Sequence, residues 1–489
     1  MAMSQSRDTP RRMPRELFGH PRGLAFLFTT EMWERFSYYG MRALLVLYMV
    51  KYLLLPGNAE GVIGLATLKS LLESVFGPLE AQPFSSNIYG FYTGLVYLTP
   101  FFGGLIADRL LGQHRTILIG ATLMAAGHFM MAFEPLFLFA LTVLILGNGC
   151  FKPNMSAQVG SLYGPGDPRR DRAYLIFYVG INLGAALAPY VCGTLGEEVG
   201  WHYGFGAAGV GMVIGLAIYS FALASHALPL DELHRAKAAA EVKPPPLSRT
   251  EWRAIIALLI LFLPNTLFWA TYEQQGNTIA LWAEDYTNRH IDLLFWRGEI
   301  PTTWFQSFNP IMIMAFTPFV IALWARQARR RSEPSSITKM AFGCFGVALA
   351  NLLMVGAAWQ SSGAPDASWH WLFGYFVILT IGELYLSPVG LSLVSKASPT
   401  HMVSMMMGVW LGTSFIGNFI GGWLGSFWNT METTSFYQIA LQLLPIIGFD
   451  GPPSAIGKIS FFLMIATIAA AAGLVILAFN RPLRGVLKD

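Results

Sequence analysis

Long apolar runs, separated by short polar or charged segments, follow one another along most of the chain. A run of about eighteen or more apolar residues is long enough to cross a bilayer as a helix. The runs predict twelve spanning helices and an all-α polytopic membrane protein. The expected spans lie at about 24–54, 87–108, 116–133, 136–162, 172–196 and 203–226, and then at about 254–280, 307–325, 338–359, 370–395, 404–428 and 459–480.

A polar connector separates the first six predicted spans from the last six. Its charges and the run Pro244-Pro245-Pro246 make it a linker and not a further span. The expected division of the chain is an N-terminal segment at 1–23, a six-helix bundle at 24–226, a linker at 227–252, a second bundle at 253–480 and a tail at 481–489.

The distribution of lysine and arginine predicts the orientation. Twenty-four of them lie on the side that holds both termini and the linker, and only five lie on the other side, namely Lys51, Lys69, Arg289, Arg297 and Lys458. Positive loops stay in the cytoplasm, so both termini are expected there.

The two halves carry similar residues at similar spacings. Thr30, Trp33 and Gly40 in the first span keep the spacing of three residues in the seventh, at an offset of 236, namely Thr266, Trp269 and Gly276. Such a repeat is typical of two helical bundles related by an axis along the membrane normal, and it predicts a binding site at their interface near the midplane.

The first predicted span contains four charged residues in an otherwise apolar run. Glu31, Glu34, Arg35, Tyr38 and Arg42 fall at offsets of 0, 3, 4, 7 and 11, so they share one face of a helix. Each charge costs roughly 2.5 to 3.5 kcal/mol at the membrane centre, so this face is expected to line an interior with partners and water, which we interpret as a transport pathway.

Three more ionisable residues lie in other predicted spans: Lys152, Glu273 and Glu383. Three positive groups then face four negative ones, and an unmatched carboxylate in an apolar cavity tends to take a proton. The alternative is a static set of ion pairs between helices. Lys152 and Glu383 lie on equivalent spans of the two halves, which favours a gate that opens and closes.

Aromatic and amide side chains accompany these charges in the spans. Amides both donate and accept hydrogen bonds, and aromatic walls accommodate varied side chains, so the set suits a zwitterionic ligand with an amide backbone. The residues are Tyr97, Asn182, Trp269, Tyr272, Gln275, Asn309, Trp410 and Ser414.

Composition supports a membrane protein and excludes other classes. Hydrophobic residues make up 54% of the chain and charged residues 12%, about half the usual share of a soluble domain. The net charge of +4 resides in loops, which argues against nucleic-acid binding. The three cysteines lie in predicted spans without metal-ligand spacing, so buried free thiols are expected. Loop acids such as Glu73, Glu197 and Glu198 are expected to be solvated.

The motifs resemble those of the proton-dependent oligopeptide transporter family of the major facilitator superfamily. The first-helix signature E-x-x-E-R-F-x-Y-Y-G is matched from Glu31 to Gly40. It is joined by YLTP at 97–100, GGLIADRLLGQHR at 103–115, GNGCFKPN at 147–154, FYVGINLG at 177–184, FWATYEQQG at 268–276, WFQSFNP at 304–310 and GELYLSP at 382–388.

The resemblance implies a major facilitator fold and proton-coupled import of di- and tripeptides by alternating access. It assigns proton coupling to Glu31, Glu34, Arg35 and Lys152, the peptide carboxylate to Arg35 and Lys152, and the peptide amino group to Glu383. Arg42 with Glu273 resembles the outer gate, and Lys152 with Glu383 the inner gate. The implied pocket also holds Tyr38, Tyr97, Asn182, Trp269, Asn309, Trp410 and Ser414, and the cytoplasmic loop motif is Asp108, Arg109 and Arg115.

The chain departs from the family pattern in three ways. The connector is too short and polar for the two extra helices of many bacterial members. Gly90 stands near the place of a histidine in animal members, so the proton site should rest on carboxylates, and His128 is expected to be a satisfied core residue. Tyr272 replaces a position that is often Gln or Glu, which leaves side-chain preference open.

Other readings share part of this pattern. A drug/proton antiporter or a small-anion carrier would have the same fold and loop motif. A membrane hydrolase is not expected, because GTSFIG at 412–417 lies in a span without a nearby histidine or a preceding strand. We expect no enzyme activity, no cofactor or metal, no nucleic-acid partner, and a monomer in the inner membrane of a bacterium with protons as co-substrate.

Overall fold

The structure is a computed structural model, and it describes residues 16–164, 167–229, 247–293, 296–362, 364–399, 402–449 and 451–487. Long helices occupy all twelve predicted ranges. They are α1 (Gly23–Tyr48), α3 (Ala81–Ile106), α4 (Gln113–Met130), α5 (Phe137–Ser161), α6 (Arg169–Ala188), α7 (Trp201–Ala224), α9 (Arg249–Tyr272), α11 (Phe308–Arg329), α12 (Ser336–Ser361), α13 (His370–Ala397), α14 (Val403–Ser426) and α16 (Pro453–Leu487).

Shorter turns extend these helices or connect them. Four π-helical segments continue long helices: η1 (Met49–Leu53), η3 (Ala107–Leu111), η5 (Pro189–Gly193) and η6 (Leu195–Val199). The 3-10 turns are η2 (Ala59–Gly61), η4 (Glu134–Leu136), η7 (Glu273–Gly276), η8 (Thr302–Ser307), η9 (Phe427–Asn429), η10 (Met431–Thr433) and η11 (Pro445–Ile447).

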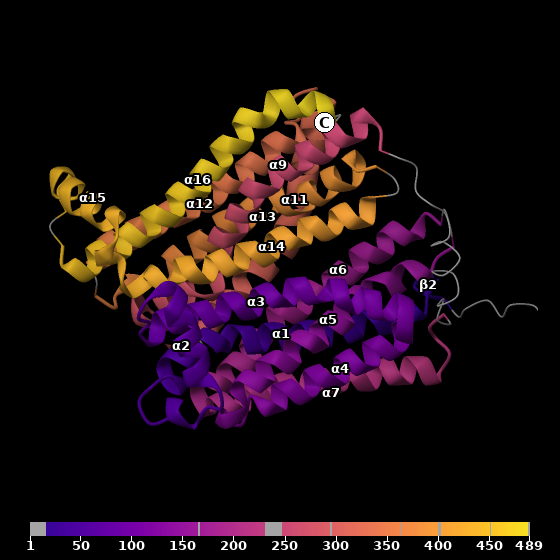
Figure 1. Cartoon of the computed structure of the whole chain (residues 1–489), viewed down its shortest axis with the longest axis horizontal. Helices are drawn as coiled ribbons and strands as arrows, with labels where there is room; N and C mark the ends of the chain where they lie inside the picture. Colours follow the sequence, from indigo (N-terminus) through magenta and orange to yellow (C-terminus); the bar gives the residue numbers. More distant parts are fainter. Residues whose placement is uncertain are drawn as a thin grey trace, which may run out of the picture.

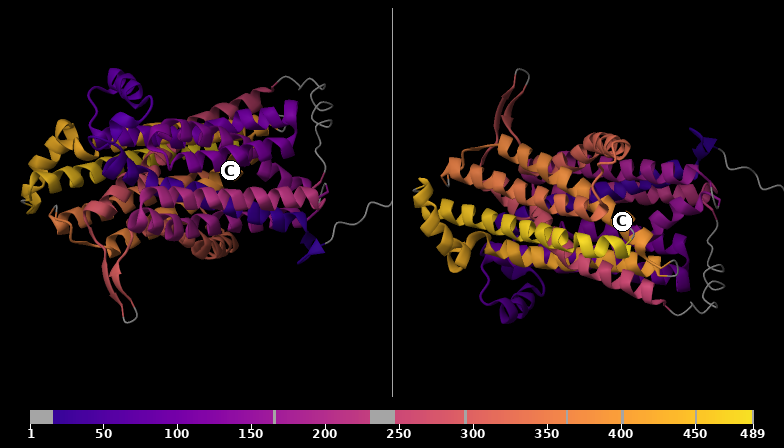
Figure 2. Two further views of the ribbon diagram at one scale, coloured as in Figure 1. Left: turned by 90° about the horizontal axis from the view of Figure 1, so that it is seen from below. Right: turned by 90° about the horizontal axis from the view of Figure 1, so that it is seen from above.

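Three short helices and six short strands lie outside the predicted spans, except that α10 begins at Thr278, within the predicted span 254–280. The helices are α2 (Leu65–Phe76), α10 (Thr278–Asp285) and α15 (Ser435–Leu443). β1 (Glu16–Leu17) pairs with β2 (His20–Pro21), β3 (Thr287–Asn288) pairs in parallel with β6 (Ala367–Ser368), and β4 (His290–Leu293) forms an antiparallel hairpin with β5 (Trp296–Glu299). Figure 2 shows this hairpin projecting from the side of the molecule.

The helices form two groups that follow the chain order. In Figure 1, α1 to α7 lie in the lower half and α9 to α16 in the upper half. We call the end that holds β2 and the C-terminal end of α16 the linker end, and the end that holds α2 and α15 the loop end. The exact boundaries of the predicted bundles stay predictions, because residues 1–15 and 230–246 lie outside the described residues.

Nine of the described helical segments are long and apolar enough to cross a membrane by composition alone. The segment that starts with α1 is not among them, because its charged residues interrupt its apolar run. The charges that make α1 unsuited to lipid are buried inside the protein: Glu31, Glu34, Arg35 and Arg42 are all less than 9% exposed. An all-helical polytopic membrane protein is therefore confirmed.

Backbone approaches backbone across the two halves at a point where glycine faces glycine. A Cβ added at Gly90 of α3 would lie 2.6 Å from the Cα atom of Gly422 in α14 and 2.8 Å from the carbonyl oxygen of Asn418. Backbone meets backbone here, so no side chain fits. A histidine at position 90 would separate the two helices, which gives a physical reason for its absence from this chain.

Two predictions about single residues need correction here. Cys150, Cys192 and Cys344 are free thiols as expected, but Cys150 is only half-buried. His128 is fully buried, yet neither of its ring nitrogens has a hydrogen-bond partner in the described part of the chain, so it is not the satisfied core histidine that we expected.

Candidate functional site

A cavity of about 350 Å³ lies between the two halves. Its walls come from α1, α3, α5, α6 and η5 on one side and from α9, η7, η8, α11, α13 and α14 on the other. The predicted residues that line it are Arg42, Tyr97, Lys152, Asn182, Trp269, Tyr272, Glu273, Gln275, Asn309, Glu383, Trp410 and Ser414. Residues far apart in the chain thus form one site, as the internal repeat predicted.

Some predicted residues lie behind the wall, and some wall residues were not predicted. Glu31, Glu34, Arg35 and Tyr38 are buried next to the cavity and do not line it. Tyr39 lines it instead of Tyr38. Four polar wall residues escaped the sequence analysis as pocket residues: Tyr39, Tyr178, Gln306 and Ser387. Tyr39 belongs to the first-helix signature, so its motif was a signal, but the face it occupies depends on the rotation of α1.

Arg35 is held by two carboxylates of its own helix. Its Nε donates to Glu34 Oε2 at 2.5 Å and its Nη2 donates to Glu34 Oε1 at 2.7 Å. Asn148 of α5 adds a hydrogen bond to Glu34 Oε1 at 3.2 Å. Glu31 lies one helical turn away, 3.3 Å from Arg35 Nε, and its buried Oε2 has no hydrogen-bond partner among the residues that the structure describes. Glu34 is therefore fully engaged, whereas Glu31 has one oxygen left over.

Lys152 is the cation of the cavity wall on the first half. Its Nζ lies 4.6 Å from the centre of the Tyr97 ring, a cation–π contact between α5 and α3. It forms no ion pair with a carboxylate of the described residues. An ammonium held against an aromatic face and facing a cavity is free to receive an anionic ligand group.

Glu383 is the matching anion on the second half. Its Oε2 accepts hydrogen bonds from the Tyr272 hydroxyl at 2.6 Å and from Asn309 Nδ2 at 2.9 Å. The ring of Phe268 stacks on Tyr272, with centroids 5.5 Å apart, and fixes its orientation. Both donors reach the same carboxylate oxygen, which leaves Oε1 for a further partner.

The two predicted gates differ in the structure. Arg42 of α1 and Glu273 of η7 form an ion pair across the halves, and Arg42 Nε also donates to the Tyr89 hydroxyl at 2.8 Å. Lys152 and Glu383 line the same cavity but form no ion pair with each other. Their role as gates stays a prediction.

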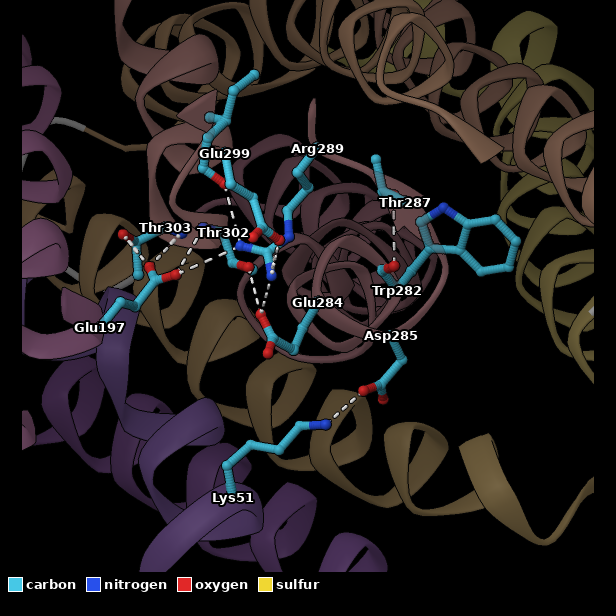
Figure 3. A network of polar contacts seen from close by, with 11 residues as sticks. Lys51, Glu197, Trp282, Glu284, Asp285, Thr287, Arg289, Glu299, Thr302 and Thr303 are labelled. Carbon is cyan, nitrogen blue, oxygen red and sulfur yellow. Dashed lines mark hydrogen bonds and ion pairs between the residues drawn. The ribbon is translucent and has the colours of Figure 1, made fainter. Parts of the chain in front are cut away.

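Polar contacts between the halves gather at the loop end. Gln82 Nε2 of α3 donates to the carbonyl oxygen of Gly425 at 3.0 Å, and Ser86 Oγ donates to Asn277 Oδ1 at 3.0 Å. Lys51 pairs with Asp285 near the same end, as Figure 3 shows. The loop motif residues Asp108, Arg109 and Arg115 are exposed around η3 and the start of α4, at the linker end.

The prediction that Glu197 is solvated is wrong. Its side chain is only 11% exposed, because it lies between the halves and contacts Arg289, Thr302 and Thr303. Sequence reasoning missed it because a glutamate near a helix end looks like surface, and only the packing of the second half covers it. Glu198, its neighbour, is exposed as expected.

The arrangement suits a small zwitterion. A cation on one half and an anion on the other face a common space, with aromatic and amide side chains between them. A ligand that carries both charges could contact both halves at once, and a ligand with a single charge would leave one group unpaired in an apolar environment.

The sequence is similar to one protein family and to several known proteins over most of its length. The sequence model of the POT family matches residues 114–227 and 247–440. A peptide transporter of Yersinia enterocolitica is 33% identical over 488 residues, covering 86% of this chain and 90% of that protein. A di-/tripeptide transporter of Lactococcus lactis is 31% identical over 530 residues, covering 96% of this chain and 97% of that protein.

Solved structures agree with these sequence matches. A crystal structure of a peptide transporter POT in complex with sulfate has a TM-score of 0.77 and 29% identity, and it covers 97% of this chain and 98% of its own. A POT family transporter in complex with 5-aminolevulinic acid has a TM-score of 0.75 and 27% identity, with 96% and 98% covered.

Proposed function

The chain belongs to the POT family and is a transporter of di- and tripeptides, and we propose that it imports them together with protons by alternating access. The observation that carries this proposal is the cavity in which Lys152 and Glu383 face a common space from opposite halves. The protein is a transporter and not an enzyme. Its proposed location is a bacterial inner membrane, with the linker end in the cytoplasm, as a monomer.

The charges of a peptide fit the charges of the cavity. The peptide carboxylate would bind Lys152, with Arg35 contributing from behind the wall. The peptide amino group would bind the open oxygen of Glu383. Asn182, Asn309, Ser414 and Gln275 could hydrogen-bond the amide backbone, and Tyr97, Trp269 and Trp410 could contact side chains. The Yersinia and Lactococcus relatives are peptide transporters, which supports this substrate class.

Glu31 is the carboxylate that we propose takes the proton. Its Oε2 is buried without a hydrogen-bond partner in the described ranges, whereas both oxygens of Glu34 are bound by Arg35. Protonation of Glu31 removes one negative charge beside Arg35, so the cations Arg35 and Lys152 become available to a peptide carboxylate. This would couple proton binding to substrate binding.

Alternating access requires two closures that exclude each other. The Arg42–Glu273 ion pair supports a closed loop end, and the separation of Lys152 from Glu383 supports an open path toward the linker end. We infer that the structure corresponds to the state that releases peptide into the cytoplasm. In the opposite state, Lys152 and Glu383 would approach and the contacts at the loop end would break.

The direct test is uptake of labelled dialanine by proteoliposomes under an imposed proton gradient. A proton that enters down about 100 mV and one pH unit supplies roughly 2.3 plus 1.4 kcal/mol, enough for several hundredfold accumulation. We expect accumulation that collapses when a protonophore is added, and its loss in Lys152→Ala. Equal uptake with and without the gradient would contradict proton coupling, and no dialanine uptake would contradict the substrate assignment.

A further inference from the structure

The start of η8 in the second half is capped by a side chain from the first half. The residue at the N-cap position is Pro301, and no side-chain hydrogen bond of its own satisfies the first turn. Glu197 of η6 supplies the acceptors instead. The backbone N–H of Thr302 donates to Glu197 Oε2 at 2.7 Å, and that of Thr303 donates to Oε1 at 2.8 Å. A carboxylate is favourable here because a helix start exposes unsatisfied N–H groups.

The hydroxyl of Thr303 completes the contact. It donates to Glu197 Oε1 at 2.6 Å, so one carboxylate accepts three hydrogen bonds across the interface. Figure 3 shows Glu197 reaching from one group of helices to Thr302 and Thr303 in the other. Hydrogen bonds to a charged acceptor are stronger than neutral ones, so this contact contributes more than an ordinary surface interaction.

Gly193 makes room for this approach. A Cβ at position 193 would lie 1.9 Å from Thr303 Oγ1, so the threonine side chain occupies the space that any other residue would fill. One turn away, Trp304 Nε1 donates to Thr194 Oγ1 at 2.8 Å. Ser307 Oγ donates to the carbonyl oxygen of Ala186 at 2.8 Å. The whole of η8 therefore docks along α6 and its π-helical extensions.

Arg289, which lies in the second half like η8, contacts the residues just before the capped turn. Its Nη1 donates to the carbonyl oxygen of Ile300 at 3.0 Å, just before the start of η8. Its Nη2 lies 2.9 Å from Glu299 and 3.3 Å from Glu284, and its Nη1 lies 3.8 Å from Glu197. These contacts, drawn in Figure 3, orient the turn that Glu197 caps.

The capped turn leads directly into the binding cavity. η8 ends at Ser307 and continues into α11, which begins at Phe308. Gln306 and Asn309, both cavity residues, lie within seven positions of the capped Thr302. Asn309 is also one of the two donors to Glu383. The position of η8 thus sets the position of the group that orients the proposed amino-group site.

We propose that Glu197 is a positioning residue for transport, which closes the loop end by capping η8 and thereby places Gln306 and Asn309 in the substrate cavity. The contact joins the two halves at a different seam from Arg42–Glu273, because it links η6 to η8 and not α1 to η7. It must break whenever the loop end opens. This inference rests on the alternating access of the proposed function.

The test measures the distance across this seam directly. Spin labels are placed at Tyr203→Cys and Asp366→Cys, two exposed positions in opposite halves, with the three native cysteines replaced by alanine. Double electron–electron resonance in proteoliposomes, without peptide or gradient, then gives the distribution of distances between the two labels. The share of long distances is the share of molecules with an open loop end. This background must first transport dialanine as the natural chain does.

Glu197→Gln keeps the size of the side chain but loses the charge that the three donors share. We expect the ratio of open to closed loop ends to rise about tenfold, the effect of losing charge-assisted hydrogen bonds. Thr303→Val, which leaves Glu197 intact, should shift the ratio in the same direction. The matched control is Glu198→Gln, which removes the same charge from an exposed neighbour and should leave the distances unchanged.

Transport kinetics give a second readout. If Glu197 positions Asn309, Glu197→Gln should raise the KM for dialanine as well as shift the distances. The proposal would be overturned if the label distances in both Glu197→Gln and Thr303→Val match those of the natural chain, whatever the rate of dialanine uptake. Failure of proton-driven uptake in the natural chain would instead overturn the proposed function, while the distance measurement would still decide the role of Glu197.

Discussion

Glu31 and Glu34 occupy the same face of α1 but are held in different ways. Arg35 binds both oxygens of Glu34, and Asn148 adds a third hydrogen bond. Glu31 contacts Arg35 through one oxygen and leaves the other buried without a partner. A buried carboxylate oxygen without a donor is costly when charged, so a proton is stabilising there. The proposed function therefore gives the two acids separate roles, in which Glu34 fixes Arg35 and Glu31 exchanges the proton.

Glu31→Gln should uncouple the transporter. The amide has about the same size and no negative charge, so it mimics the protonated acid permanently. We expect loss of gradient-driven accumulation of dialanine, while exchange of labelled for unlabelled dialanine across the membrane continues. Both are measured in the same proteoliposomes, so the exchange assay controls for folding. Retained accumulation would remove Glu31 from the coupling role.

Tyr272→Phe should weaken substrate binding through Glu383. The substitution removes the hydroxyl that donates to Glu383 at 2.6 Å but keeps the ring that stacks on Phe268. A hydrogen bond to a charged group contributes roughly 1.5 to 3 kcal/mol, so the KM for dialanine should rise about tenfold or more. The control is Tyr375→Phe in the same helix as Glu383, because the buried Tyr375 hydroxyl has no hydrogen-bond partner among the described residues. Equal KM changes in both variants would refute the assignment.

Several site residues could be predicted from the sequence, and the reasons are physical. Lys152, Glu273 and Glu383 stand out because a charge in an apolar span needs a function or a partner. Arg35 and Tyr38 were expected in the cavity wall, but the side chain of Arg35 turns along its own helix toward Glu34. The periodicity of a helix gives the face of a residue, and it does not give the direction of a long side chain or the exact rotation of the helix.

At the scale of elements, the crossing of α3 and α14 sets how closely the halves can pack. Gly90 and Gly422 bring the two backbones into contact, and the rings of Phe91 and Phe419 contact each other nearby. The length and position of both helices follow from their apolar runs. The crossing point does not, because any small residue in either helix could have served, and only the assembled pair shows which one does.

Gly90→Ala should destabilise the pair of helices. The added methyl group would meet backbone atoms of Gly422 and Asn418, which cannot move aside without shifting α14. Overpacking of this kind costs about 1 to 3 kcal/mol, so the detergent-solubilised protein should unfold at a lower temperature. Gly104→Ala is the control in the same helix, since its added methyl group would meet nothing within 4 Å. An unchanged melting temperature for Gly90→Ala would contradict the proposed packing.

The contacts that the elements at the loop end make could not be predicted from the sequence. The short helices α2, α10 and α15 and the hairpin β4–β5 lie in segments that the sequence analysis treated as loops. Glu197 was expected to be solvated for the same reason. Whether a polar loop residue is exposed depends on the other half of the molecule, and a pattern along the chain contains no information about that approach.

At the scale of the whole molecule, the proposed alternating access requires that the halves move while each stays intact. The Arg42–Glu273 pair joins α1 to η7 across the halves, beside the cavity. Reversing either charge alone places two like charges together, which costs several kcal/mol and should hold the loop end open. The double variant Arg42→Glu with Glu273→Arg restores an attractive pair.

The charge reversal predicts a specific pattern of dialanine exchange. Each single variant should lose most of the exchange rate, and the double variant should recover part of it. Recovery is expected to be partial because the double variant loses the hydrogen bond from Arg42 to the Tyr89 hydroxyl. A double variant no better than either single variant would show that the two side chains do not act as one gate.

The central claim of the proposed function is that import of a peptide through this cavity is coupled to the entry of protons. The most direct measurement traps a pH-sensitive dye inside proteoliposomes with a membrane potential that is negative inside, and then adds dialanine outside. We predict that dialanine acidifies the interior with the natural chain, and that neither Lys152→Ala nor Glu31→Gln shows this acidification. Uptake of dialanine by the natural chain without any acidification would contradict the account.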